Sequence, residues 1–318
     1  MHDLAQRILK KEVRALARAI TYIENQHPER LTILKDLHPY QDQSYVLGIT
    51  GAPGAGKSSL VNRLVSYLRA QGLSVGVIAV DPTSPFTGGA LLGDRVRMAN
   101  HFTDPEVFIR SMGTRGSLGG VARATKEAIR LVSAFGKDVI IVETVGVGQS
   151  ELDIMKVADS TAVVLTPGGG DSVQAFKAGI MEIADFYIIN KADLQGAEKL
   201  EAEIHYMLDL VKHDASWRPP VVKTISTQDK GLDLVWATCL DHRSYLKDST
   251  LGEERKKERI VAEMLEILEQ QYLGLMQKQL STDVYKERIE RIKAGELDPY
   301  STAEELFQDW LNNREANE

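Results

Sequence analysis

Apolar positions follow two different periods along the middle of the chain. Between Tyr45 and about Lys247, short apolar runs typical of buried strands are separated by stretches in which apolar residues recur at helical spacing. The strand-like runs lie at residues 45–50, 75–80, 107–109, 139–142, 162–165, 186–189 and 221–225. This alternation predicts an α/β domain over residues 45–247, built on a doubly wound, mostly parallel sheet.

The two flanking regions, residues 1–44 and 248–318, have helical spacing throughout. The first predicts a single helix that ends at His27-Pro28, and then a short helix near residues 31–37. The second predicts a long helix with an apolar stripe and two shorter helices, at residues 260–276, 284–292 and 303–311. These C-terminal helices either cover their own domain or form a dimerisation arm. The length of the stripe favours the arm, and therefore a homodimer.

A glycine-rich segment connects the first predicted strand to the helical pattern that follows it. It reads Gly-Ala-Pro-Gly-Ala-Gly-Lys-Ser over residues 51–58. Its glycines let backbone N–H groups converge on phosphate oxygens, Lys57 supplies positive charge to the β- and γ-phosphates, and Ser58 offers a hydroxyl to Mg²⁺. The strand-loop-helix context is the one that a phosphate-binding loop (P-loop) requires. The expected contacts come from Gly51, Gly54, Ala55, Gly56, Lys57, Ser58 and Ser59.

A second polar motif, Asn190-Lys191-Ala192-Asp193, directly follows the apolar run at residues 186–189. The Asp193 carboxylate can accept two hydrogen bonds, from the N1–H and the exocyclic amine of guanine, whereas adenine presents no such pair of donors. Lys191 can lay its aliphatic stem over the base. Asn190 can tie the motif to the P-loop. The two motifs in this order predict GTP rather than ATP as the nucleotide.

Acidic residues between these motifs are candidates for Mg²⁺ binding. Asp81 ends the run at residues 75–80, and Asp94 follows a glycine-bearing loop. Many GTPases have Asp-x-x-Gly after the central strand. Here Glu143-Thr-Val-Gly146 occupies that place, and the glutamate is expected to reach Mg²⁺ through water, with the Gly146 N–H directed to the γ-phosphate. A helix cap or a solvated charge is the alternative for each carboxylate. The expected metal-binding set is Ser58, Asp81, Asp94 and Glu143.

Composition narrows the class of partner. The 318-residue chain has a formal net charge of −7 and a single cysteine, Cys239. Acidity disfavours nucleic acid and anionic membranes as partners, and one cysteine excludes a disulfide framework. No apolar run approaches the roughly 20 residues of a membrane span, and the first residues do not resemble a signal peptide. We expect a cytoplasmic protein that uses GTP/GDP and Mg²⁺.

Five motifs along the chain form a distinctive set. They are the P-loop, Asp81-Pro-Thr-Ser-Pro, Met112-Gly-Thr-Arg-Gly-Ser-Leu-Gly-Gly, Glu143-Thr-Val-Gly-Val-Gly-Gln-Ser-Glu and Pro167-Gly-Gly-Gly-Asp. Together they resemble the MeaB/ArgK family of P-loop GTPases over nearly the whole chain. The resemblance implies a protein similar to methylmalonic aciduria type A protein. Such proteins are G-protein chaperones that gate adenosylcobalamin loading into methylmalonyl-CoA mutase and protect this enzyme.

The resemblance also assigns roles to individual residues. It implies that Lys57, Asp94 and Glu143 carry catalysis and that Ser226 belongs to the last loop contacting the base, where Thr227 replaces the usual alanine. It further implies a third switch over residues 168–178, which would couple nucleotide state to the mutase. The polar residues of that segment are Asp171, Gln174 and Lys177. From the residues alone, the segment could equally be an ordinary strand-to-helix loop.

Hydrolysis is less clearly encoded. Gln149 lies three residues after Gly146 and is therefore not placed like the water-orienting glutamine of many GTPases. We expect slow intrinsic turnover that a partner accelerates, with Arg97 or Lys177 placed against the developing phosphate charge.

Three other functions remain open at this point. An ATPase or kinase of lysine, arginine and ornithine transport is disfavoured by the guanine motif. A metallochaperone GTPase is disfavoured because the chain has no cysteine or histidine cluster. A nucleotide-binding scaffold without turnover is the third. The histidines are most simply surface or capping residues, namely His101, His205, His213 and His242. The client could also be another acyl-CoA mutase that uses adenosylcobalamin.

Overall fold

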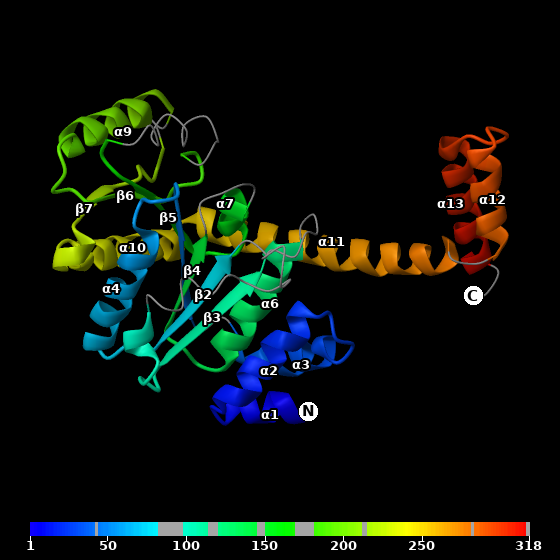
Figure 1. The fold of residues 1–318 in the computed structure, drawn as a ribbon, viewed down its shortest axis with the longest axis horizontal. Helices are drawn as coiled ribbons and strands as arrows, with labels where there is room; N and C mark the ends of the chain where they lie inside the picture. The colour runs from blue at the N-terminus through cyan, green and yellow to red at the C-terminus, as the bar shows by residue number, and fades with distance from the viewer. Residues whose placement is uncertain are drawn as a thin grey trace. The chain divides into compact units, whose positions relative to one another are not determined.

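The computed structural model describes eight stretches of the chain (Figure 1): residues 1–41, 44–81, 98–113, 120–144, 150–168, 181–211, 215–280 and 283–315. The chain divides into two compact units, Met1–Ser249 and Thr250–Glu318. The division lies close to residue 248, where the C-terminal arm was predicted to begin. Each unit is described by itself.

The first unit is built on a seven-stranded sheet in which every strand pairing is parallel. Its strands are β1 (Tyr45–Thr50), β2 (Val75–Asp81), β3 (Val107–Gly113), β4 (Val139–Thr144), β5 (Ser160–Leu165), β6 (Phe186–Asn190) and β7 (Val221–Thr224). The strand order is β3-β2-β4-β1-β5-β6-β7. The predicted doubly wound sheet is therefore confirmed. After β1 the chain forms β2, β3 and β4 on one side of this strand, and then β5, β6 and β7 on its other side. The carboxyl end of β1 therefore lies at the point where the strand order reverses.

Helices cover both faces of the sheet (Figure 1). The helices of one face are α4 (Lys57–Ala70) and α10 (Leu232–Asp248), and those of the other are α6 (Gly120–Ala134) and α9 (Ala197–Val211). Along β4, Ile141 packs in the cluster under α4, whereas its neighbours Ile140 and Val142 pack in the cluster under α6. Burial on both faces explains why these strands read as continuous apolar runs rather than as alternating ones.

The N-terminal region forms more helices than the sequence predicted. The helices are α1 (Asp3–Leu9), α2 (Val13–Glu24) and α3 (Arg30–Leu37), followed by the 3₁₀ turn η1 (His38–Tyr40). The single helix predicted up to His27 is wrong, because Lys11 has a φ of +64° and interrupts the helix between α1 and α2. The N–H of Lys11 donates to the Ile8 carbonyl at 2.9 Å, which closes α1. Ile8, Leu16 and Ile20 then pack in the same apolar cluster as α6.

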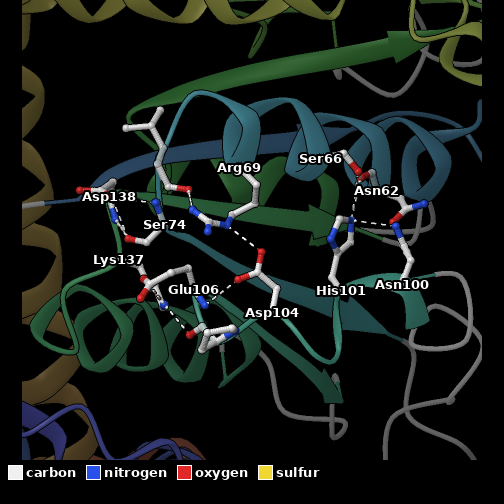
Figure 2. Close-up of polar contacts among 12 residues, drawn as sticks. Asn62, Ser66, Arg69, Ser74, Asn100, His101, Asp104, Glu106, Lys137 and Asp138 are labelled. Carbon is white, nitrogen blue, oxygen red and sulfur yellow. Dashed lines mark hydrogen bonds and ion pairs between the residues drawn. The ribbon is translucent and has the colours of Figure 1, made fainter.

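The segment that leads into β3 is attached to α4 by polar contacts (Figure 2). Arg69 Nε of α4 donates to Asp104 Oδ2 at 2.8 Å. His101, in the 3₁₀ turn η2 (Ala99–His101), has its Nε2 atom 3.1 Å from the Asn62 carbonyl oxygen and 3.4 Å from Ser66 Oγ. The part of α4 from Asn62 to Arg69 is thereby joined to the chain ahead of β3.

Two of the histidines that were predicted to be surface or capping residues are buried. His101 is 7% exposed and His242 is 1% exposed. His242 Nδ1 lies 2.6 Å from Ser160 Oγ, and its Nε2 lies 3.4 Å from Asp185 Oδ1. No local pattern in the sequence indicates this burial, because the partners of both histidines lie far away along the chain. His205 is exposed, as predicted. His213 lies outside the described residues.

The second unit is helical, as predicted. It consists of α11 (Thr250–Leu280), α12 (Asp283–Lys293) and α13 (Pro299–Glu315). Tyr272 of α11 contacts Phe307 of α13 edge-on at a centroid distance of 6.2 Å, and Arg288 of α12 lies 3.5 Å from Glu305. None of the described helices combines the length and the apolarity needed to cross a membrane.

Candidate functional site

The P-loop lies between the carboxyl end of β1 and the first turn of α4. Gly56, in the left-handed conformation at a φ of +85°, caps α4, which begins at Lys57. Lys57 is 6% exposed, and its Nζ donates to the carbonyl oxygens of Gly51 at 2.7 Å and Ala52 at 3.0 Å. The lysine side chain is therefore folded back across the loop, with its charge held at the place where phosphate oxygens were predicted to bind.

Ser58 and Glu143 meet at the start of α4. Ser58 Oγ donates to Glu143 Oε1 at 2.7 Å, and both residues are buried. The contact follows from the sheet order, because β4 lies beside β1 and Glu143 pairs with Ile49. Next to it, Thr144 Oγ1 donates to Thr50 Oγ1 at 2.9 Å, which joins the carboxyl ends of the two strands. A hydroxyl and a carboxylate at this spacing are oxygen ligands of the type that Mg²⁺ prefers.

Asn190 connects the predicted guanine segment to the P-loop. Its Nδ2 donates to the Ala55 carbonyl at 2.9 Å, while its Oδ1 accepts from Ser226 Oγ at 2.7 Å and from Thr224 Oγ1 at 3.1 Å. Asn190 is 2% exposed, so these bonds are shielded from water. A Cβ atom on Gly56 would lie 2.5 Å from Asn190 Nδ2, which explains why the P-loop needs a glycine there.

Of the remaining residues predicted to contact guanine, Lys191 and Asp193 are exposed, whereas Ser226 is buried. Lys191 adopts a φ of +56° and its Nζ donates to the Gly54 carbonyl at 2.9 Å. Asp193 is exposed, two residues further on. Ser226, in the 3₁₀ turn η4 (Ser226–Gln228), directs its hydroxyl to Asn190. Two P-loop carbonyls are thus bound by consecutive residues of the second motif, and the motifs meet although they lie more than 130 positions apart in the sequence.

Other predicted residues are located only in part. The backbone of Asp81 ends β2 opposite Gly113. Ser59 is exposed on the first turn of α4. The residues that lie outside the described residues are Asp94, Arg97, Gly146, Gln149, Asp171, Gln174 and Lys177. Within the described parts of the chain, no three histidine, cysteine or acidic side chains come together as a metal site.

Sequence reasoning missed two residues that the structure brings to this region. Thr224, at the end of β7, shares the oxygen of Asn190 with Ser226. Glu151, in the short helix α7 (Ser150–Asp153), is 5% exposed. Burial raises the pKa of the Glu151 carboxyl group, and the charge of Lys57 opposes this shift. The signal for Glu151 was its place as the last residue of the motif that begins at Glu143.

The fold and the loop define the class of protein. A parallel sheet with a Gly-x-x-x-x-Gly-Lys-Ser loop between its β1 strand and the following helix is that of a P-loop nucleoside triphosphatase. Residues 16–281 match the family described as "Methylmalonyl Co-A mutase-associated GTPase MeaB". The chain belongs to this family of GTPases.

Individual relatives agree with the family assignment. A protein of Pyrococcus abyssi with a provisional GTPase name is 47% identical, over 96% of each chain. The mouse protein named "Methylmalonic aciduria type A homolog, mitochondrial" is 36% identical, over 73% of this chain and 60% of its own length. Among solved structures, the one titled "LAO/AO transport system kinase" matches with a TM-score of 0.69 at 27% identity and covers 97% of each chain.

Proposed function

We propose that this chain is a G-protein chaperone that hydrolyses GTP and gates the loading of adenosylcobalamin into an acyl-CoA mutase. Methylmalonyl-CoA mutase is the first candidate client, since the family description names it. The observation that carries the proposal is the bonding of Asn190 and Lys191 to the P-loop carbonyls of Ala55 and Gly54. This arrangement can pass a change at the phosphates to the base-binding segment.

Nucleotide recognition would be shared between the two motifs. The exposed carboxylate of Asp193 is open to accept hydrogen bonds from a guanine edge, and Lys191 lies between it and the P-loop. Backbone N–H groups of the P-loop and the amino terminus of α4 would bind the phosphates. Lys57 would exchange its two carbonyl contacts for phosphate oxygens, which are charged and therefore stronger acceptors.

Ser58, Asp81, Asp94 and Glu143 are proposed to hold Mg²⁺. The observed pair of Ser58 and Glu143 oxygens fits such an ion. When bound, Mg²⁺ supplies positive charge to the β- and γ-phosphates. In the absence of phosphates, the same hydrogen bond keeps the Ser58 hydroxyl and the Glu143 carboxylate in place, so little reorganisation is needed when nucleotide arrives.

Hydrolysis on its own is proposed to be slow and to be stimulated by the client. Lys57 can neutralise charge that develops on the transferred phosphoryl group. Arg97 and Lys177 are the candidates for additional positive charge once a partner is bound. Loss of stimulation in Lys177→Ala with intrinsic turnover unchanged would assign this role to Lys177, and intact stimulation would remove it.

The chain is also proposed to form a homodimer through α11. Large apolar side chains along this helix are 48–58% exposed, and they recur at helical spacing. They are Ile260, Val261, Met264, Leu265 and Leu268. A contiguous apolar helix face of this kind is typical of an interface.

The test is GTP turnover by the full chain, alone and with purified candidate mutases, with ATP as the nucleotide control. We expect turnover specific to GTP and stimulation by one adenosylcobalamin-dependent mutase. Asp193→Asn should weaken GTP binding at least about tenfold, because an amide cannot accept both guanine hydrogen bonds. Asp241→Asn, which removes an exposed carboxylate from α10, is the matched control. Preference for ATP would contradict the proposal and favour a transport-linked kinase instead.

A further inference from the structure

The carboxyl group of Glu151 is unusual because it is buried without a hydrogen-bond donor at one oxygen. The residue is 5% exposed, and its Oε1 atom has no hydrogen-bond partner among the described residues. A buried polar atom in this condition destabilises the fold, and more strongly when it is charged. Since such atoms are uncommon in folded proteins, the position calls for a functional explanation.

Strand pairing and packing place Glu151 at the phosphate end of β1. The carboxyl ends of β4 and β1 are joined by the bond between Thr144 and Thr50. After α7, Ile154 of the 3₁₀ turn η3 (Ile154–Lys156) returns onto β1, where a Cβ atom on Gly48 would lie 2.7 Å from Ile154 Cγ1. Glu151 precedes Ile154 by about one helical turn. It therefore lies beside the end of β1 from which the P-loop starts.

Several charged groups lie on the elements around Glu151. On its own helix and the adjoining turn, Asp153 and Lys156 pair with each other at 2.8 Å. On α6, Glu127 pairs with Arg123 at 3.0 Å. Among the described residues, the positive charge of Lys57 acts on the Glu151 carboxyl group and lowers its pKa, against the effect of burial. Both side chains are buried, so water screens their interaction weakly.

We propose that Glu151 is a positioning residue that acts through Lys57 and weakens nucleotide binding. The proposal rests on GTP and GDP binding at the P-loop and concerns the strength and speed of that binding. The carboxylate attracts the lysine ammonium group, for which the β- and γ-phosphates compete. It also repels the phosphates directly. Glu151 therefore favours the state in which Lys57 is folded back on Gly51 and Ala52, and it promotes release of the nucleotide.

The experiment compares the full-length wild-type chain with Glu151→Gln, measuring affinity and dissociation rate for a fluorescent GDP analogue and affinity for GTP by competition. The amide keeps the size of the side chain and removes its charge. We expect binding about tenfold tighter, equivalent to about 1.4 kcal/mol, with correspondingly slower GDP release. Glu151→Met, a second neutral side chain of similar length, should act in the same direction. Unchanged or weaker binding in both variants overturns the proposal.

Two controls separate this role from a structural one. Asp153→Asn removes a charge from the same helix, where it pairs with Lys156, and should leave affinity within about twofold. GMP lacks the phosphates that Lys57 reaches, so Glu151→Gln should leave GMP affinity unchanged. Equal tightening of GMP and GDP would show that the effect does not pass through Lys57.

If the wild-type chain bound no guanine nucleotide at all, the proposed function itself would be wrong. That outcome is distinguishable from failure of the Glu151 proposal alone, in which wild type binds GDP and the variants bind it no more tightly.

Discussion

Replacing Asn190 with alanine tests whether the second motif supports the P-loop. The side chain has three buried hydrogen bonds of 3.1 Å or less, with Ala55 at 2.9 Å, Ser226 Oγ at 2.7 Å and Thr224 at 3.1 Å, and a longer one from the Ser226 N–H at 3.4 Å that is left out of the sum. At about 1 kcal/mol for each bond, the variant Asn190→Ala should lose about 3 kcal/mol of unfolding free energy. For a unit of this size, that loss lowers the melting temperature by on the order of 10 °C.

The assay is urea unfolding, together with GTP affinity. Affinity should also fall, because the Ala55 carbonyl loses the donor that holds the loop in place. Ser226→Ala is the matched control. It removes one donor to the same Asn190 oxygen and should cost only about 1 kcal/mol. The double variant should cost less than the sum of the two single ones, since they share a bond. A loss below about 1 kcal/mol in Asn190→Ala, with GTP affinity unchanged, would refute the reasoning.

Three further predictions concern other parts of the chain. Gly56→Ala should abolish tight GTP binding, because the added Cβ would lie 2.5 Å from Asn190 Nδ2. Gly72→Ala is the control, since Gly72 has a similar φ of +81° but nothing within 4 Å of an added Cβ. It should lower the unfolding free energy by about 1 kcal/mol and leave GTP binding intact. The hydrogen bond from Arg69 lowers the pKa of Asp104 below its usual 3.8. This pair stabilises the fold by roughly 0.5–1 kcal/mol at pH values above the usual pKa, and the stabilisation is lost as pH falls through the lowered pKa. The unfolding free energies of Asp104→Asn and wild type, measured in urea, should therefore converge in acid. Leu268→Asp in α11 should yield monomers in analytical ultracentrifugation and leave GTP affinity unchanged; a variant that remains dimeric would contradict the proposed interface.

Local chemistry made much of this protein readable from its sequence. The P-loop is a run of adjacent residues between a strand and a helix, so its identity does not depend on distant contacts. The strands were equally clear, because burial on both faces leaves apolar runs such as Val139–Val142. By contrast, the break between α1 and α2 was missed. Lys11 has no local signal comparable to a glycine, and its left-handed conformation is maintained where α1 and α2 pack in a common core.

The sequence by itself determined the class of nucleotide site, because phosphate and guanine recognition use short motifs whose spacing sets their geometry. Only the tertiary structure decided how these motifs meet. Ser58 reaches Glu143 because β4 inserts between β2 and β1, and Asn190 reaches Ala55 because β6 and β7 extend the sheet on the other side. The buried carboxyl group of Glu151 has the same origin. Its environment is made by strands and turns that are far apart along the chain, and no local pattern records such an environment.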